Sequence, residues 1–301
     1  MLEKAITFYS DGLRLDGTLY LPSDLRPGER RPAVIACSGY LGLNAIYPHL
    51  FAEPLTRGGY VVLGFDYRGN GKSEGTPGRL LIEEQVRDIK SGLTFIREQG
   101  EVVRDRVALL GWGMGAGSVI EVAARDERPR AVIALNGFYN GRSFLRARHG
   151  DLGLKSLWAR LEEDRVKRSL TGHGEFADPY AVYPLDPATK AEVEANLVPV
   201  PGFGPQTAFE LLESILAFDA ESVVHKIAPR PLFVGHGEQN QLHPFEDALS
   251  LYGKAERPKK FYRIEGKHND FMRRDHPSFG ALADTLVAWL TEQFEAMAAS
   301  G

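Results

Sequence analysis

The chain has 301 residues, of which 43% are hydrophobic and 25% charged, as in an ordinary globular protein with a sizeable core. A net charge of −4 gives no electrostatic reason to expect nucleic acid or an anionic membrane as a partner. The one cysteine, Cys37, excludes an internal disulfide and is typical of a reducing compartment. No apolar run approaches the roughly 20 residues that span a bilayer, and residues 1–12 lack the features of a signal peptide. We therefore expect a cytoplasmic protein.

Short strands and helices alternate along most of the chain. Residues 5–9 and 13–21 alternate apolar and polar side chains on either side of Asp11-Gly12, which predicts a β-hairpin. Short apolar runs predict further strands at residues 33–37, 60–65, 107–110, 132–135, 231–234 and 261–264. Helical periodicity predicts helices at residues 47–57, 80–97, from 114 onward, at 245–252 and at 278–297. Such alternation indicates an α/β fold with a mostly parallel sheet covered on both faces.

Residues 139–222 differ from the rest of the chain. They contain helical pieces at residues 154–168 and 207–217 and a proline-rich middle at residues 178–205, but no convincing strand. The segment falls between two expected strands. We therefore predict a mainly helical lid inserted at residues 139–222 into a core of residues 1–138 and 223–301.

Motifs at the ends of the expected strands resemble those of one superfamily. In chain order they are SGYLG (38–42), FDYRGNGKSEG (65–75), GWGMG (111–115), VGHGEQNQLHP (234–244) and EGKHNDF (265–271). A strand that meets a helix at closely spaced glycines is how the α/β-hydrolase fold presents a nucleophile as G-x-S-x-G. Outside residues 139–222 the sequence resembles the α/β-hydrolase superfamily, particularly its dienelactone-hydrolase-like and acyl-peptidase-like branches. The resemblance implies a doubly wound sheet of the α/β-hydrolase type.

The same resemblance implies a degenerate catalytic triad. The family nucleophile falls on Gly113, the family acid on Asn240 and the family histidine on His268. Glycine has no side chain, so no acyl-enzyme can form at residue 113. Asn240 can accept a hydrogen bond from an imidazole but has no charge to stabilise an imidazolium. In serine proteases an Asp-to-Asn change alone costs about 10⁴ in kcat, so serine-type hydrolysis is disfavoured by two independent changes.

The remaining groups predict a pocket suited to proton transfer. The backbone N–H of Met114, with one near Tyr40 or Leu41, matches the usual oxyanion hole. Gly113 leaves space beside these donors for water, a carboxylate or a carbonyl group. His268, with the neutral Asn240 as its partner, is expected to be uncharged at pH 7. A neutral histidine beside an oxyanion hole suits proton transfer to or from carbon, oxygen or water.

Other side chains that could replace the lost groups have simpler expected roles. Ser118 lies five positions beyond Gly113, about 140° around a helix with roughly 100° per residue, and should point elsewhere. Cys37 is expected to be an inert side chain in a buried strand. Asp247 should be helical, and Asp270 follows the histidine too closely to serve as its acid.

Substrate contacts are expected from both the core and the lid. Ser38 borders the expected site, although we favour a turn role for it. Tyr139 could line an apolar cavity or simply pack. Arg142 and Arg146 could hold a substrate carboxylate or belong to a solvated charged face.

The other histidines give no metal-ligand spacing such as H-E-x-x-H, so we expect no metal. His236 is expected to pack at a strand end, and His243 to lie on a loop surface. The glycines at 111 and 113 do not form a dinucleotide site, because several strands precede them. We expect no cofactor.

Two classes of function remain open. The first is an enzyme acting on a small carbonyl-containing substrate by His-dependent, non-covalent chemistry, either hydrolytic or C–C bond cleaving as in lyases and decarboxylases. The second is a catalytically inactive small-molecule binding protein or receptor. A serine hydrolase whose nucleophile was replaced by mutation is a third interpretation. In each case the expected partner is a small molecule, and a homo-oligomer is compatible with the sequence.

Overall fold

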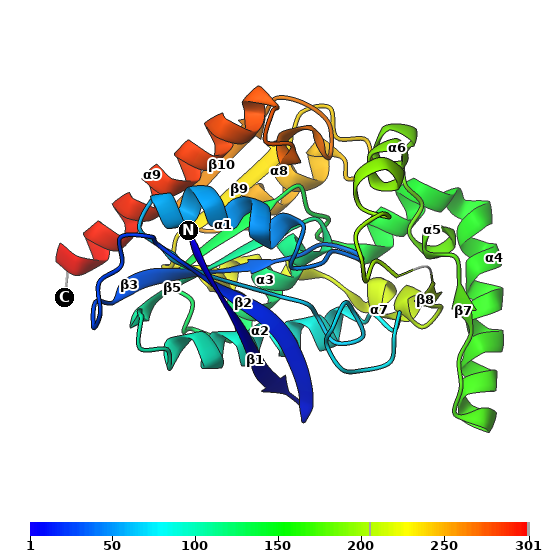
Figure 1. Ribbon diagram of the computed structural model, residues 1–301. Coiled ribbons are helices and arrows are strands. Elements are labelled where there is room, and N and C mark those ends of the chain that lie inside the picture. The colour runs from blue at the N-terminus through cyan, green and yellow to red at the C-terminus, as the bar shows by residue number, and fades with distance from the viewer. Residues whose placement is uncertain (205, 300–301) are drawn as a thin grey trace.

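A computed structural model describes residues 1–204 and 206–299. Figure 1 shows a twisted central sheet with helices on both faces. Within the described residues the sheet has eight strands in the order β1-β2-β4-β3-β5-β6-β9-β10. The strands are β1 (Leu2–Ser10), β2 (Leu13–Leu21), β3 (Arg31–Cys37), β4 (Val61–Phe65), β5 (Val102–Trp112), β6 (Ala131–Leu135), β9 (Leu232–Gly237) and β10 (Lys259–Ile264).

The pairing confirms the fold class that the sequence predicts. β1 and β2 form the expected antiparallel hairpin, with Asp11 and Gly12 at φ 48° and 81° in its turn. β2 pairs antiparallel with β4, and every pairing from β4 to β10 is parallel. Parallel strands end at the same edge of a sheet, so the loops after β3, β5, β9 and β10 meet there.

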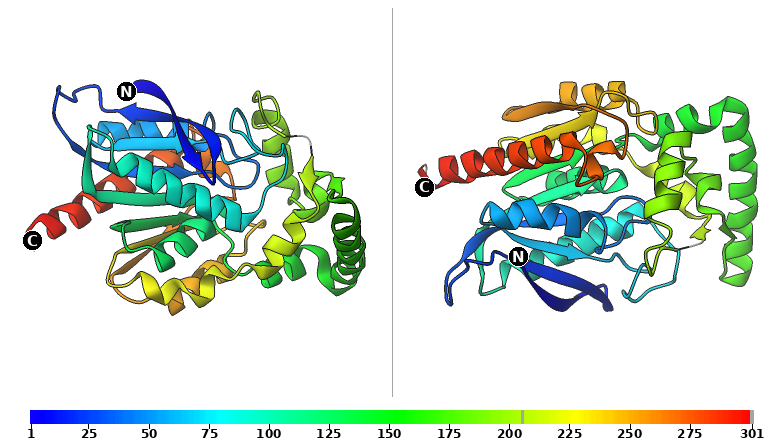
Figure 2. Two further views of the ribbon diagram at one scale, coloured as in Figure 1. Left: turned by 90° about the horizontal axis from the view of Figure 1, so that it is seen from below. Right: turned by 45° about the horizontal axis from the view of Figure 1, so that its top comes forward.

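Helices cover both faces of the sheet (Figure 2). They are α1 (Tyr47–Arg57), α2 (Ile82–Arg97), α3 (Met114–Arg125), α8 (Phe245–Lys254) and α9 (Pro277–Ala299). Alternate residues of β3 belong to different apolar clusters: Ile35 packs with α2 and α3, and Val34 with α1 and α9. This follows from the two-residue period of a strand, whose successive side chains point to opposite faces.

The elements of residues 139–222 gather at one end of the sheet (Figures 1 and 2). They are α4 (Gly141–Thr171), β7 (Phe176–Ala177), α5 (Pro179–Val182), α6 (Pro187–Asn196), β8 (Thr207–Ala208), α7 (Leu211–Ala217) and a 3-10 turn, Ala220–Ser222. The expectation that this segment lacks strands is wrong in one detail, since β7 and β8 form a two-stranded antiparallel sheet. Two-residue strands are too short to produce a visible alternation in sequence. The function of the segment as a lid stays a prediction.

The motif of residues 65–75 forms hydrogen bonds that fix neighbouring loops. The carboxylate of Asp66 accepts the backbone N–H of Asn44, 2.7 Å away, which ties the loop after β3 to the loop after β4. Arg68 is buried and donates to Asp88 through both Nε (2.9 Å) and Nη2 (2.6 Å), and to the hydroxyl of Ser10. The bond to Asn44 holds the loop that carries Tyr40, and the Arg68 contacts anchor the loop after β4 to α2 and β1.

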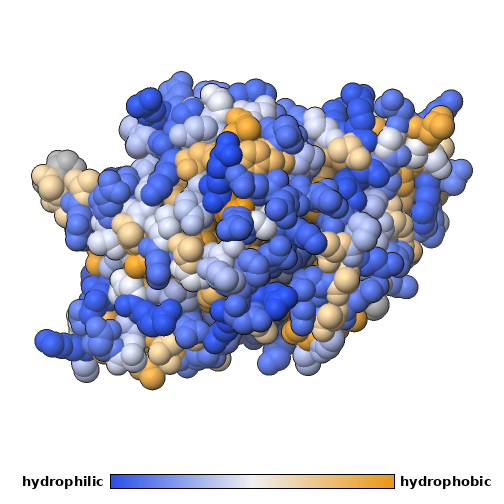
Figure 3. Space-filling view, turned by 90° about the horizontal axis from the view of Figure 1, so that it is seen from above, coloured by the Kyte–Doolittle hydropathy of each residue, from blue (hydrophilic) through white to orange (hydrophobic). Residues whose placement is uncertain are grey.

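The surface is mostly hydrophilic on the face shown in Figure 3, where apolar groups form small clusters among polar ones. Across residues 1–204 and 206–299, no helix combines the length and the apolar character required to traverse a bilayer.

Candidate active site

The joint between β5 and α3 has the geometry of a nucleophile elbow. Gly113 joins the two elements at φ 56° and ψ −123°. A Cβ on Gly111 would lie 2.2 Å from the carbonyl oxygen of Gly115, and one on Gly115 would lie 2.3 Å from that of Ser38. These two glycines are therefore required by close packing of the backbone.

Gly113 is different, because space surrounds it. For a Cβ at this residue the nearest atom of the described chain, apart from its sequence neighbours, is the Cα of Gly39 at 3.8 Å. Packing therefore does not exclude a side chain here, although the positive φ strains any residue other than glycine. The place where a serine hydroxyl would lie is free of protein atoms.

The loops after β9 and β10 bring Asn240 and His268 together. The imidazole Nδ1 of His268 lies 3.2 Å from Asn240 Oδ1. That oxygen also accepts the backbone N–H groups of Leu242 (3.1 Å) and His243 (3.0 Å). Because two backbone donors fix this atom as an acceptor, Nδ1 of His268 must carry the hydrogen. In the neutral ring Nε2 then has the free lone pair.

His243 is buried, so the expectation of a loop-surface histidine is wrong. Its Nδ1 lies 2.6 Å from the carbonyl oxygen of Asn136 and therefore donates to it. Its Nε2 accepts the hydroxyl of Tyr183, also at 2.6 Å. Tyr183 comes from residues 139–222 and covers His243, a contact between distant parts of the chain that no local pattern shows.

The imidazoles of this region are held uncharged. Burial lowers the pKa of His268 well below its ordinary value, and the neighbouring His243 and His236 lower it further. Burial also lowers the pKa of His243 to about 3 and that of His236 to about 4. His236 lies buried at the end of β9, which confirms the expected packing at a strand end. All three rings are neutral at pH 7.

A small cavity of about 40 Å³ joins the elbow to His268. It is lined by core residues Tyr40, Leu41, Tyr47, Trp112, Gly113, Met114, Leu242, His268 and Asn269, and by Tyr180, Tyr183, Leu185, Thr189, Val193, Leu197 and Phe203 from residues 139–222. The residues expected to form the oxyanion hole thus surround one space with His268. Met114 begins α3, so its N–H has no acceptor within the helix. A cavity of this size holds one or two water molecules.

The four possible substrate contacts, Ser38, Tyr139, Arg142 and Arg146, do not line this cavity in the described part of the chain. Ser38 is buried and donates to the carbonyl oxygen of Leu43 at 3.4 Å, in agreement with a turn role. Tyr139 is buried in the core. The two arginines are exposed and line a separate surface hollow on α4.

The residues considered as replacements for the triad lie elsewhere. The hydroxyl of Ser118 donates to the carbonyl oxygen of Met114 (3.1 Å), as expected for a helix residue that points away. Cys37 is buried, and burial raises the pKa of its thiol to about 12. Asp270 accepts the backbone N–H of Lys267 (2.9 Å), and Asp247 lies in α8.

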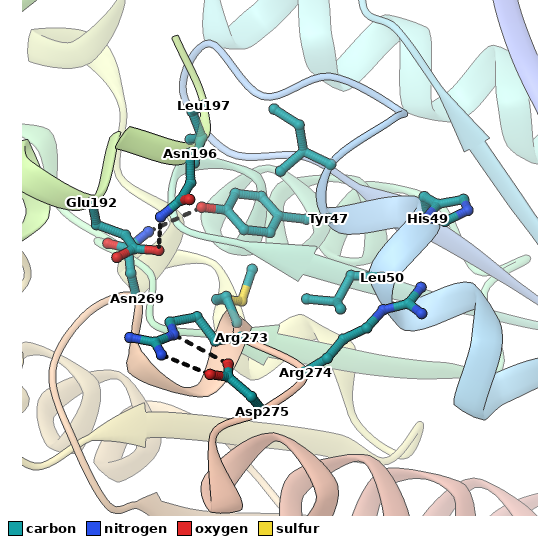
Figure 4. Close-up of a pocket in the computed structure, with 12 residues that line it drawn as sticks. Tyr47, His49, Leu50, Glu192, Asn196, Leu197, Asn269, Arg273, Arg274 and Asp275 are labelled. Carbon is teal, nitrogen blue, oxygen red and sulfur yellow. Dashed lines mark hydrogen bonds and ion pairs between the residues drawn. The ribbon is translucent and has the colours of Figure 1, made fainter. Parts of the chain in front are cut away.

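A second, larger pocket of about 480 Å³ lies outside the small cavity (Figure 4). Tyr47, Leu197 and Asn269 line both spaces and form the wall between them. Sequence analysis missed Tyr47 and Asn269. The only available signal was the position of Asn269 directly after His268.

The elbow, the loop histidine and the eight-stranded sheet define an α/β-hydrolase fold. The model of the family described as serine aminopeptidase, S33, matches residues 28–269. The chain therefore belongs to this family and is an enzyme of the α/β-hydrolase superfamily.

The chain is also similar to individual proteins. An uncharacterized 31.7 kDa protein in the traX-finO intergenic region of Escherichia coli is 26% identical over 268 residues, which cover 88% of this chain and 91% of the relative. The quorum-quenching protein AidA of Acinetobacter baumannii is 31% identical over 159 residues, 52% of this chain and 51% of AidA. The crystal structure of the α/β hydrolase GrgF from Penicillium has a TM-score of 0.81 at 22% identity, with 97% of this chain and 99% of GrgF covered. The last comparison concerns the fold alone.

Proposed function

We propose that this enzyme hydrolyses a small activated carbonyl compound through water activated by His268, without an acyl-enzyme. The observation that carries the proposal is the open space beside Gly113, in a cavity that His268 also lines. A water molecule fits where the family places a hydroxyl. Residues 139–222 act as the lid over this space.

The reaction follows from the positions of the donors and the base. Nε2 of His268 takes a proton from water as the water oxygen attacks the carbonyl carbon. The backbone N–H of Met114 and one from Tyr40 or Leu41 stabilise the negative charge on the carbonyl oxygen. When the intermediate collapses, the bond to the leaving group breaks and the proton on Nε2 passes to the leaving oxygen or sulfur. The products are a carboxylic acid and an alcohol or thiol.

The electrostatics of His268 restrict the substrate. A histidine with a lowered pKa is a weak base, and Asn240 gives its protonated form no countercharge. Attack by water is then the demanding step, so the carbonyl must itself be electrophilic. Esters, lactones and thioesters meet this requirement better than amides. We therefore favour an ester or thioester over a peptide. Cleavage of a C–C bond could use the same groups, but the water-sized cavity favours hydrolysis.

The test uses 4-nitrophenyl butyrate and the variant His268→Gln. We expect linear release of 4-nitrophenol without an initial burst, an unchanged intact protein mass after rapid quenching, and a loss of at least about 10²-fold in kcat/KM in the variant. Replacement of the exposed His173 by Gln is the matched control and should leave the rate unchanged. A burst, an acylated protein or full activity in His268→Gln would overturn the mechanism.

A further inference from the structure

A buried chain of hydrogen bonds leads from residues 139–222 to the residue that carries the base. The hydroxyl of Tyr183 donates to Nε2 of His243 at 2.6 Å, and Nδ1 of that ring donates to the backbone carbonyl oxygen of Asn136, also at 2.6 Å. The side-chain amide of Asn136 in turn donates to the backbone carbonyl oxygen of His268 at 2.9 Å. All four residues are buried. The bonds therefore run without a break from the lid segment to His268.

Asn136, at the centre of this chain of bonds, has an unusual backbone conformation. It follows β6 directly and has a φ of 47°, a value that residues other than glycine rarely adopt. Its backbone N–H donates to the carbonyl oxygen of Gly235 (2.9 Å), and its Oδ1 accepts the N–H of Gly237 (2.6 Å). With the bonds to His243 and His268, each polar group of this residue is paired. Strained residues of this kind persist where the surrounding structure determines them, and they gather at functional sites.

His243 also contacts the imidazole of His268 directly. The two ring centres lie 4.8 Å apart, and the rings are nearly perpendicular, at 88°. Because Asn240 Oδ1 lies 3.2 Å from Nδ1 of His268, the base is restrained by a hydrogen bond and by a packing contact. Both ring nitrogens of His243 are engaged in hydrogen bonds, so this ring has no free lone pair for proton transfer. Its contacts suit a role in holding His268.

The same part of the lid contacts the loop of the expected oxyanion hole. The ring of Tyr183 stacks on that of Tyr40, with the ring centres 4.6 Å apart and an angle of 26° between the planes. The hydroxyl of Tyr40 donates to the backbone carbonyl oxygen of Pro179 at 3.0 Å. Residues 179–183 therefore contact both loops whose groups the proposed mechanism uses.

We propose that Asn136, His243 and Tyr183 are positioning residues for His268, and that the base is held firmly only while residues 179–183 cover the site. This inference rests on the proposed function, in which His268 takes a proton from water. A cavity of about 40 Å³ is too small for an ester, so part of the lid must move when substrate enters and products leave. Separation of Tyr183 from His243 loosens the base, and the return of Tyr183 restores its position for the attack of water.

The kinetic test removes one hydroxyl from the chain of hydrogen bonds. Tyr183→Phe loses the bond to His243 but retains the ring that stacks on Tyr40. With 4-nitrophenyl butyrate we expect kcat to fall about tenfold, because a buried acceptor is left unpaired. The KM should change by less than about twofold, because the cavity keeps its shape. Combined with His268→Gln, Tyr183→Phe should cause no further loss, since a positioning residue acts only through the base.

A second variant separates the side-chain amide of Asn136 from the backbone conformation. Asn136→Gly deletes the amide, and glycine adopts a positive φ without steric cost. The value of kcat should again fall by about tenfold, and only in protein that has His268. Tyr60→Phe is the matched control for Tyr183→Phe. It removes an equally buried tyrosine hydroxyl, 3.0 Å from that of Thr291 in α9, and should leave kcat unchanged with either residue at position 268.

The kinetic outcomes separate this inference from the proposed function. If the ester is hydrolysed in a His268-dependent way and Tyr183→Phe retains full activity, the positioning role is wrong and the mechanism stands. An equal loss from Tyr183→Phe with histidine and with glutamine at residue 268 also refutes the positioning role, because the loss then does not pass through the base.

A measurement without substrate decides the case in which the ester is not hydrolysed and the proposed function fails. Proton NMR follows the exchange with water of the hydrogen on Nδ1 of His268, which His268→Gln identifies. We expect this exchange to be about tenfold faster in Tyr183→Phe than in the wild type or in Tyr60→Phe, because a loosened ring opens its bond to Asn240 more often. An unchanged exchange rate would refute the positioning role.

Discussion

Asn240 Oδ1 lies 3.2 Å from Nδ1 of His268, where the superfamily resemblance places a carboxylate. The amide fixes the ring in the tautomer that a catalytic base requires, with Nε2 unprotonated. It does not provide the charge that would raise the basicity of the ring. In the mechanism that we propose, the orientation of the base is therefore retained while its electrostatic activation is absent.

Restoring that charge should strengthen the base. In Asn240→Asp we expect the carboxylate to raise the pKa of His268, because an adjacent negative charge favours the imidazolium. The value of kcat/KM for 4-nitrophenyl butyrate at pH 8 should rise about tenfold. NMR titration of the histidines and initial rates measure the two effects. Gln239→Glu adds the same charge on the exposed neighbouring residue and should change neither. Reduced activity in Asn240→Asp would contradict the assigned roles.

A serine at residue 113 should be tolerated but nearly inactive by itself. The nearest non-neighbouring atom to a Cβ at this position lies 3.8 Å away, so Gly113→Ser has room for its side chain. Without a carboxylate at residue 240, however, we expect the kcat of covalent catalysis by a serine to be lower by a factor of about 10⁴. We expect no burst of 4-nitrophenol from Gly113→Ser and a clear burst, with an acylated protein mass, from Gly113→Ser combined with Asn240→Asp. A strong burst from the single variant would indicate that another residue serves as the acid.

The rate should be insensitive to pH around neutrality. The base works in its neutral form, and the lowered pKa of His268 keeps it neutral well below pH 6.5. We expect kcat/KM for 4-nitrophenyl butyrate to vary by less than about twofold between pH 8 and pH 6. A histidine with the ordinary pKa of about 6.5 would lose roughly three quarters of the rate in that interval. Such a loss, with circular dichroism showing a folded protein at both pH values, would contradict the assignment.

The parts of the fold that the sequence predicts depend on local patterns. The helix at residues 47–57 matches α1, because its periodicity and the glycines that follow it lie within one stretch of chain. The sharp turn at Gly113 is recognisable for the same reason: the turn needs glycines, and glycines are visible in the sequence. His268 and Asn240 could be paired only through the superfamily resemblance, since 28 residues separate them.

The parts that could not be predicted depend on contacts between distant segments. His243 is buried because Tyr183, 60 residues earlier, donates to it. Asn269 lies beside Tyr47 across 222 residues of sequence. For Arg142 and Arg146 the sequence leaves open a substrate contact or a solvated charged face, and the structure shows both side chains exposed beside a separate surface hollow on α4. These three arrangements depend on how distant segments pack together, and local sequence patterns do not show that packing.

Because the three buried histidines are neutral, we expect acid to lower the stability of the folded protein before the carboxylates become protonated. His236, His243 and His268 have lowered pKa values in the folded protein, whereas in the unfolded chain each has a pKa of about 6.5. Below pH 6.5 the unfolded state therefore binds more protons than the folded state, and stability falls as the pH decreases toward the folded values of about 4 for His236 and about 3 for His243. Above pH 6.5 this contribution to stability is fully present.

Between pH 7 and pH 5.5 each buried histidine should lower the free energy of unfolding by about 1 kcal/mol, so that the three together remove several kcal/mol. Urea unfolding at the two pH values measures this loss. In His236→Gln the decrease in the free energy of unfolding between the two pH values should be about one third smaller than in the wild type, because one of the three titrating groups is absent. This holds whatever the stability of the variant at pH 7. Replacement of the exposed His173 by Gln should leave the loss as in the wild type. Equal stability of the wild type at pH 7 and pH 5.5 would show that these rings accept protons in the folded protein, and a charged His268 could not serve as the base.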